Sequence, residues 1–216
     1  MYLTEKLAVS LGKKAKILLD LNEDSEQIVI YGAINLLQTI LSILWIVIAG
    51  FILGVLYEAL IFSTSASILR KYSGGVHASS PNLCIVFGTT LASIVGLIIN
   101  KLLYKISFTV TLTISTFFII ASFTIIILKA PVDSTKKPIT NLDMKKKFRK
   151  NSIITLIAFS ATIIILSVIY KVTSQLYYLK IIQSIILGIL WQSITLTKTG
   201  ITIFKKIDFI FSKIYT

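Results

Sequence analysis

The chain alternates long apolar runs with shorter polar segments that are mostly basic. A bilayer core is about 30 Å thick, so a helix of about 20 apolar residues crosses it. Six runs have this length: Ile28–Ile48, Phe51–Leu69, Leu83–Leu103, Ile106–Leu128, Ser152–Tyr170 and Leu176–Leu196. The pattern therefore predicts an all-α integral membrane protein with about six transmembrane helices, forming one polytopic domain over residues 1–216.

The boundary between the first two runs is weakly marked. Only Ala49-Gly50 separates them, and no charged residue lies at the turn. A single bent or re-entrant unit around residues 46–54 is the alternative to two separate helices.

The two ends of the chain are amphipathic. In residues 1–26, Leu7, Leu11 and Leu18 recur at near-helical spacing between lysines, which predicts a helix on the cytoplasmic leaflet; packing against the rest of the protein is the alternative. This segment lacks the short apolar core of a signal peptide. Residues 200–216 mix aromatic and aliphatic residues with lysine, which predicts an interfacial or frayed cytoplasmic tail.

Composition supports the membrane class, since 55% of the residues are hydrophobic and 14% are charged. The net charge is +13, but the basic residues cluster beside apolar runs. We therefore expect anionic lipid and an acidic peptide as partners, and no nucleic acid.

The distribution of Lys and Arg predicts the orientation. Eighteen of the 22 flank one side: they lie in the N-terminal segment, in residues 70–84, in the basic loop 131–150 with Lys129 before it, and in the tail with Lys198 before it. The other side has only Lys101, Lys105, Lys171 and Lys180. The positive-inside rule then places both termini, residues 70–84 and the basic loop in the cytoplasm.

Residues 70–84 form a polar interruption that holds the only histidine, His77, and the only cysteine, Cys84. A thiol becomes a nucleophile when an imidazole takes its proton or when a positive potential stabilises the thiolate. Ser80 is a good N-cap and Pro81 a good first helical residue, so Cys84 should lie in the first turn of a helix. The helix dipole there favours a thiolate, and Gly74-Gly75 allows His77 to fold back toward Cys84.

A unique His and a unique Cys can also both be structural. A structural Cys normally lies inside an apolar run, whereas this one follows a Gly-Gly pair and two cations, Arg70 and Lys71, which favours a catalytic dyad. One cysteine excludes an internal disulfide, and one His with one Cys argues against a metal cluster. The nine acidic residues form no apparent carboxylate pair, so we expect no metal.

The same residues carry a family resemblance. Arg70, Gly75, His77-Ala78 and Cys84, between two transmembrane runs, resemble the accessory gene regulator B family of Gram-positive membrane peptidases. Ala130-Pro131 and Thr135-Lys136-Lys137-Pro138-Ile139 resemble that family's basic loop. Together with the hydropathy layout, the resemblance covers nearly the whole chain.

The resemblance implies a function. Such an enzyme cleaves the C-terminal part from a short amphipathic propeptide through an enzyme thioester, and a propeptide cysteine then closes a thiolactone, giving an intermediate of a quorum-sensing autoinducing peptide. Cys84 would be the nucleophile, His77 the general base and acid, and Arg70 and Gly75 supporting residues. No cofactor is needed. The resemblance also implies a homodimer in the cell membrane of a Gram-positive bacterium.

Other residues have two interpretations each. The resemblance implies that Lys136 and Lys137 contact the acidic end of the propeptide, although such a loop can serve as a topology determinant alone. Glu58, Asn82 or Ser79 could orient His77. For Glu58 we favour a structural hydrogen-bonding role.

Two other classes of function stay open. One is a small transporter or peptide-export component, with His77 as a proton relay and Glu58 as a coupling group. The other is a non-catalytic sensor or scaffold. Fast alkylation of Cys84 that depends on His77 would separate the peptidase from both.

Overall fold

The computed structural model describes residues 3–75, 80–132 and 141–214. Every regular element in these ranges is a helix, which confirms the all-α fold class. The elements, in chain order, are α1 (Leu3–Leu19), α2 (Glu23–Ile52), α3 (Leu56–Ser73), α4 (Pro81–Lys101), η1 (Leu103–Lys105), α5 (Phe108–Lys129), α6 (Leu142–Thr173), α7 (Leu176–Ile194) and α8 (Lys198–Ile214).

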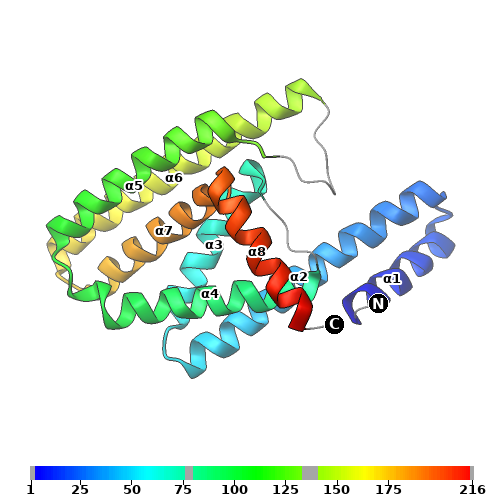
Figure 1. Cartoon of the computed structure of the whole chain (residues 1–216), viewed down its shortest axis with the longest axis horizontal. Helices are drawn as coiled ribbons and strands as arrows, with labels where there is room; N and C mark the ends of the chain where they lie inside the picture. Colours follow the sequence, from blue (N-terminus) through cyan, green and yellow to red (C-terminus); the bar gives the residue numbers. More distant parts are fainter. Residues whose placement is uncertain (1–2, 76–79, 133–140, 215–216) are drawn as a thin grey trace.

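Five helices of the described chain are long and apolar enough to cross a membrane: α2, α4 with η1, α5, α6 and α7. The second predicted run, Phe51–Leu69, corresponds to α3, which does not reach that standard because its 18 residues include Glu58, Arg70, Lys71 and several serines. Instead α3 lies in the middle of the bundle, between α4 and α7 (Figure 1).

The contact between α3 and α7 explains how so polar a helix is accommodated. Ala59, Phe62 and Leu69 of α3 are almost fully buried, as is Ser65 beside them. A side chain at Gly188 of α7 would collide with the Phe62 carbonyl, so the two backbones approach closely at this point. Small residues allow such approaches between membrane helices, and the Ser65 and Ser73 hydroxyls of α3 are buried in the bundle, while Thr64 and Ser67 are exposed.

The first two runs are separate helices, but they divide later than the sequence indicated. α2 continues through Gly50 to Ile52, and the chain turns at Leu53–Val55, where Gly54 has a φ of +67°. Positive φ favours glycine, which explains why the turn lies there and not at Ala49-Gly50.

The N-terminal segment contains two helices and not one. α1 ends at Leu19, and α2 begins at Glu23, where the Asn22 side chain accepts a hydrogen bond from the Ser25 N–H. Lys16 and Glu26 form an ion pair of 2.8 Å that ties the two helices together. α1 and the first half of α2 lie apart from the bundle (Figure 1), so α1 packs on α2 while Ile17 and Leu18 remain exposed.

Part of the segment predicted to be a loop is helical, and so is the predicted interfacial or frayed tail. The sequence treated residues 131–150 as a loop, but α6 begins at Leu142, because Asn141 caps it and no Pro or Gly follows within the basic run. Its 32 residues make a rod of about 48 Å, longer than a bilayer core. The tail is α8, and its buried Phe204 packs beside Leu83.

The helices of the bundle alternate in direction and therefore gather into two ends. We call one of them the Cys84 end: α3, α5 and α7 end there, and α4, α6 and α8 begin there. We call the opposite one, with the beginnings of α3, α5 and α7, the Glu58 end. The four basic residues assigned to the sparse side lie at the Glu58 end, on α4, η1, α6 and α7: Lys101, Lys105, Lys171 and Lys180.

Candidate active site at the Cys84 end

Cys84 lies in the first turn of α4. The Ser80 hydroxyl accepts a hydrogen bond of 3.2 Å from the Leu83 N–H, and Pro81 occupies the first helical position. The Cys84 N–H donates to the Ser80 carbonyl at 3.2 Å, which makes it the first turn-closing bond of the helix. Cys84 itself is half-buried. The predicted start of this helix is confirmed.

Arg70 lies in the last turn of α3 and interacts electrostatically with Cys84. Burial lowers the pKa of the Arg70 guanidinium, and the negative charge of a Cys84 thiolate opposes that lowering. An arginine stays protonated even with a reduced pKa, so Arg70 presents a positive charge to the sulfur. Lys71, the next residue, is exposed and lies over the Tyr72 ring instead.

Four of the predicted site residues lie outside the described residues: His77, Ser79, Lys136 and Lys137. Of the others, Asn82 is exposed at the start of α4, two residues before Cys84. Gly75 is buried at the Cys84 end, directly after the turn that terminates α3.

The Gly74–Gly75 turn, which precedes His77 in the sequence, is paired with Val132, which follows Ala130-Pro131. Gly74 has a φ of +71° and Gly75 a φ of +132°, a conformation in which side chains are strained. The Gly75 N–H donates to the Val132 carbonyl at 3.2 Å, and the Val132 N–H donates to the Ser73 carbonyl at 3.0 Å. These bonds form a short parallel bridge that holds the segment after Ala130-Pro131 against the turn before His77.

The side chain of Gln192 on α7 stabilises this bridge through two hydrogen bonds. Its Nε2 donates to the Ser73 hydroxyl at 2.9 Å and to the Gly74 carbonyl at 2.8 Å, and its side chain is almost fully buried. A side chain on Gly75 would meet Nε2 of Gln192 and the Thr195 hydroxyl at 3.4 Å. These are ordinary van der Waals distances, so it is the φ of Gly75 that favours glycine at this position.

The beginning of α6 fixes the other side of the bridge. Nε of Arg149 donates to the Ala130 carbonyl at 2.7 Å, a charge-assisted bond between α6 and the end of α5. Beside it, the first turns of α6 line a pocket of about 510 Å³ with four cations and three aliphatic residues: Lys145, Lys146, Arg149, Lys150, Leu142, Ile153 and Ile154.

An apolar cluster supports Cys84 from the side of α8. Leu83 and Phe204 are buried, and Cys84 and Phe87 pack against them. The Phe87 ring lies 5.2 Å from that of Phe204 and 5.9 Å from that of Trp191, measured between centroids. α4, α7 and α8 are thus held together around the sulfur.

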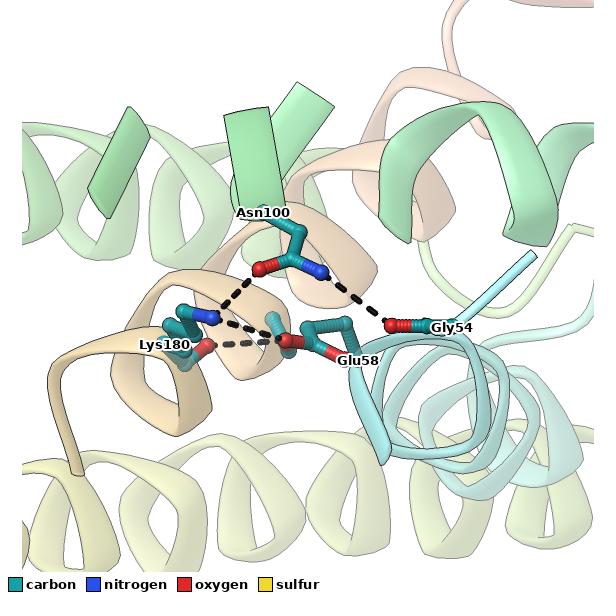
Figure 2. Close-up of polar contacts among 5 residues, drawn as sticks. Gly54, Glu58, Asn100 and Lys180 are labelled. Carbon is teal, nitrogen blue, oxygen red and sulfur yellow. Dashed lines mark hydrogen bonds and ion pairs between the residues drawn. The ribbon is translucent and has the colours of Figure 1, made fainter. Parts of the chain in front are cut away.

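Glu58 lies far from this site. It is in the first turn of α3, about 18 Å along the helix axis from Arg70. Its partner is Lys180 of α7, with 3.5 Å between Nζ and Oε1, and Lys180 also donates to Asn100 near the end of α4 (Figure 2). These contacts fit the structural role and place Glu58 at the opposite end of the bundle from Cys84.

Comparison with known proteins identifies the family. The sequence profile described as Accessory gene regulator B matches residues 4–196. The chain belongs to the accessory gene regulator B family. It is 35% and 33% identical to two AgrB-like proteins of Clostridium perfringens, strains 13 and SM101, over 94% of this chain and 96% of each relative. It is 29% identical to accessory gene regulator protein B of Staphylococcus aureus strain MRSA252, over 68% of this chain and 69% of that protein. No solved structure matches the chain significantly.

Family membership and the five apolar helices establish a membrane protein of the accessory gene regulator system, which processes quorum-sensing peptides. The matched range contains the described site, from Arg70 and Cys84 through Arg149 to Gln192.

Sequence reasoning did not single out the residues that hold this accessory gene regulator B site together: Ser73, Arg149 and Gln192. One signal was present for Gln192, because an amide inside a run predicted to span the membrane needs a polar partner. The partner is on another helix 118 residues earlier in the chain, which no local pattern reveals. Within the described residues, no three His, Cys, Asp or Glu side chains form a metal-binding group.

Proposed function

We propose that this protein is a cysteine endopeptidase that cleaves a short membrane-bound propeptide and promotes closure of its thiolactone. The observation that carries the proposal is the position of Cys84, which begins a helix and has the Arg70 cation as its electrostatic neighbour. Both features stabilise a thiolate. His77, seven residues before Cys84, is the only imidazole in the sequence.

The proposed reaction has two acyl transfers. The Cys84 thiolate attacks the scissile carbonyl, the carbon–nitrogen bond breaks, and the His77 imidazolium donates its proton to the leaving amine. A cysteine thiolate of the propeptide then attacks the Cys84 thioester, forms the thiolactone and releases the Cys84 thiolate. Sulfur replaces sulfur in the second step, so no cofactor is consumed.

Backbone N–H groups at the start of α4 suit the developing oxyanion. Pro81 has no N–H, and those of Leu83 and Cys84 already donate to Ser80. Among the described residues the Asn82 N–H has no acceptor. We assign it the oxyanion role.

The acidic end of the propeptide fits the basic surface at the Cys84 end. Lys136 and Lys137 stay in the proposal as its contacts. The basic pocket of α6 is proposed as a further contact, because Arg149 on its wall is bonded to Ala130 at the end of α5. The aliphatic floor of that pocket also suits the amphipathic character of the propeptide.

Orientation and assembly follow from the same surfaces. We place the Cys84 end and both termini at the cytoplasmic face of a Gram-positive cell membrane, because the basic residues gather there and anionic lipids attract them. A homodimer also remains part of the proposal. The half of α2 that lies apart from the bundle leaves Ile28, Leu36 and Ile40 exposed for lipid or a second copy.

The test is cleavage of a short amphipathic propeptide with a central cysteine and an acidic end, in membranes that contain the protein. Cys84→Ala and His77→Ala should each abolish cleavage while membrane insertion is unchanged. Cys84→Ser separates nucleophilicity from shape, and we expect a loss of at least about a hundredfold because a hydroxyl is a poorer nucleophile without a strong base. Cleavage retained in both alanine variants would refute the dyad.

The transporter alternative is not favoured by the position of Glu58. A coupling group of a transporter is expected near the bilayer midplane, whereas Glu58 lies at a helix beginning beside Lys180.

A further inference from the structure

The Glu58 end contains a cavity that the peptidase chemistry does not use. Its volume is about 700 Å³, in the range of ligand pockets, and it lies where α2 ends, α3 and α7 begin, and α4 passes into η1. We propose that this cavity binds the headgroup of a phospholipid that carries a primary ammonium beside its phosphate. The proposal is independent of the activity assigned to Cys84.

The cavity lies at the depth of lipid headgroups. Tyr104 and Lys105 end one apolar span, and Leu176 and Tyr177 begin another. Tyrosines concentrate at this level of a bilayer because the ring is apolar and the hydroxyl is hydrated. A headgroup therefore meets the cavity without moving toward the bilayer centre.

The rim of the cavity is exposed in the described part of the chain. Phe51 is 77% exposed, Tyr57 62% and Tyr177 47%, although all three line the cavity. Exposed aromatic and aliphatic side chains at the end of a membrane helix are solvated by lipid. They provide an apolar surface for the glycerol and upper acyl chains of the occupant.

Inside, the cavity presents one anion and one cation side by side. Glu58 and Lys180 are each largely buried, and 3.5 Å separates Oε1 from Nζ (Figure 2). A direct charge-assisted hydrogen bond is about 2.7–2.9 Å long, so the two charges attract one another without closing such a bond. Asn100 holds this arrangement, because it accepts from Lys180 and donates to the Gly54 carbonyl at 3.1 Å.

A zwitterionic headgroup complements this pair. Its ammonium can donate hydrogen bonds to the Glu58 carboxylate, and its phosphate can accept from Lys180. The Tyr104 ring, already 5.6 Å from the Lys180 ammonium, adds a cation–π surface. Phosphatidylcholine has no N–H to donate, and phosphatidylglycerol has no cation, so each satisfies only part of the site.

The experiment uses the full-length protein in nanodiscs of equimolar phosphatidylethanolamine, phosphatidylcholine and phosphatidylglycerol. Lipids retained after detergent washing are counted by mass spectrometry. We expect phosphatidylethanolamine to be enriched about tenfold to a hundredfold over each of the others, the factor given by one charge-assisted hydrogen bond. N-acetylated phosphatidylethanolamine, which lacks the ammonium, should lose this enrichment.

Three variants locate the site. Glu58→Gln should abolish the preference for phosphatidylethanolamine over phosphatidylcholine, and Lys180→Gln should reduce retention of all three lipids. Lys101→Gln is the matched control, since Lys101 is an exposed lysine at the same end that does not line the cavity. If the first two variants fail to fold, the comparison with the N-acetylated lipid on the unmodified protein decides alone.

Three results would overturn the proposal. They are equal retention of the three lipids by the unmodified protein, an enrichment that persists in Glu58→Gln, and a retained species that is a peptide.

Discussion

Nε2 of Gln192 donates a hydrogen bond of 2.8 Å to the carbonyl oxygen of Gly74, although 118 residues separate the two in the chain. The same nitrogen donates to the Ser73 hydroxyl. Gly74 and Gly75 precede His77 in the sequence. The Gln192 side chain therefore fixes the turn by which the chain leaves α3 on the way to His77.

Gln192→Leu tests this positioning role. Loss of the amide leaves a buried carbonyl and a buried hydroxyl without their donor, which should lower the free energy of unfolding by about 2 kcal/mol. Cleavage should fall with it. Gln183→Leu is the matched control, because Gln183 is also buried on α7 but donates to the Leu103 carbonyl at the Glu58 end. Both variants should have a similarly reduced Tm, and only Gln192→Leu should slow cleavage. Equal activity of the two would assign Gln192 to stability alone.

Arg70→Gln tests the electrostatic neighbour of Cys84. Removal of the guanidinium removes a charge that favours the thiolate, so alkylation of Cys84 by iodoacetamide near neutral pH should slow by about tenfold. Lys71→Gln removes the same charge from the next residue, which is exposed and lies over Tyr72. It should leave the labelling rate within about twofold, since exposed charges are screened. An unchanged rate in Arg70→Gln would remove Arg70 from the mechanism.

Ser80→Ala tests the start of α4. The cap on the Leu83 N–H is lost, which should cost about 1 kcal/mol and allow the first turn around Cys84 to fray. Ser107 caps α5 in the same way, through the Val110 N–H. Ser107→Ala should therefore cost a similar free energy in a thermal unfolding assay. Only the variant at Ser80 should alter the alkylation rate of Cys84, and a parallel effect at Ser107 would mean that general destabilisation is being measured.

Gly74→Ala tests the bridge to Val132. Gly74 and Gly54 both have a φ near +70°, so alanine at either position brings backbone strain of about 1–3 kcal/mol. A Cβ at Gly54 meets nothing within 4 Å, whereas one at Gly74 collides with the Val132 carbonyl. Gly54→Ala should be less stable yet active, and Gly74→Ala should be inactive. Activity in both would show that the bridge is dispensable.

The apolar runs, the capped start of α4 and the unique Cys84 were all readable from the sequence, because each depends on neighbours within one or two helical turns. Hydropathy also identified α3 as a run, although Glu58, Arg70 and Lys71 make it more polar than the five apolar helices, because an apolar pattern does not reveal that neighbouring helices bury Glu58 and Ser65. The extent of α6 was misjudged for a related reason. A run of lysines is compatible with either a loop or a helix, and the Asn141 cap decided between them.

The sequence by itself determined the candidate site residues and the long apolar runs beside them. Only the tertiary structure decided what holds them in place: Gln192 on Gly74, Arg149 on Ala130, and Lys180 between Glu58 and Asn100. The Gln192 and Lys180 contacts join segments at least 80 residues apart in the chain, and the Arg149 contact joins segments 19 residues apart. In a membrane bundle buried polar groups must find partners within the protein, and the packing of whole helices selects those partners.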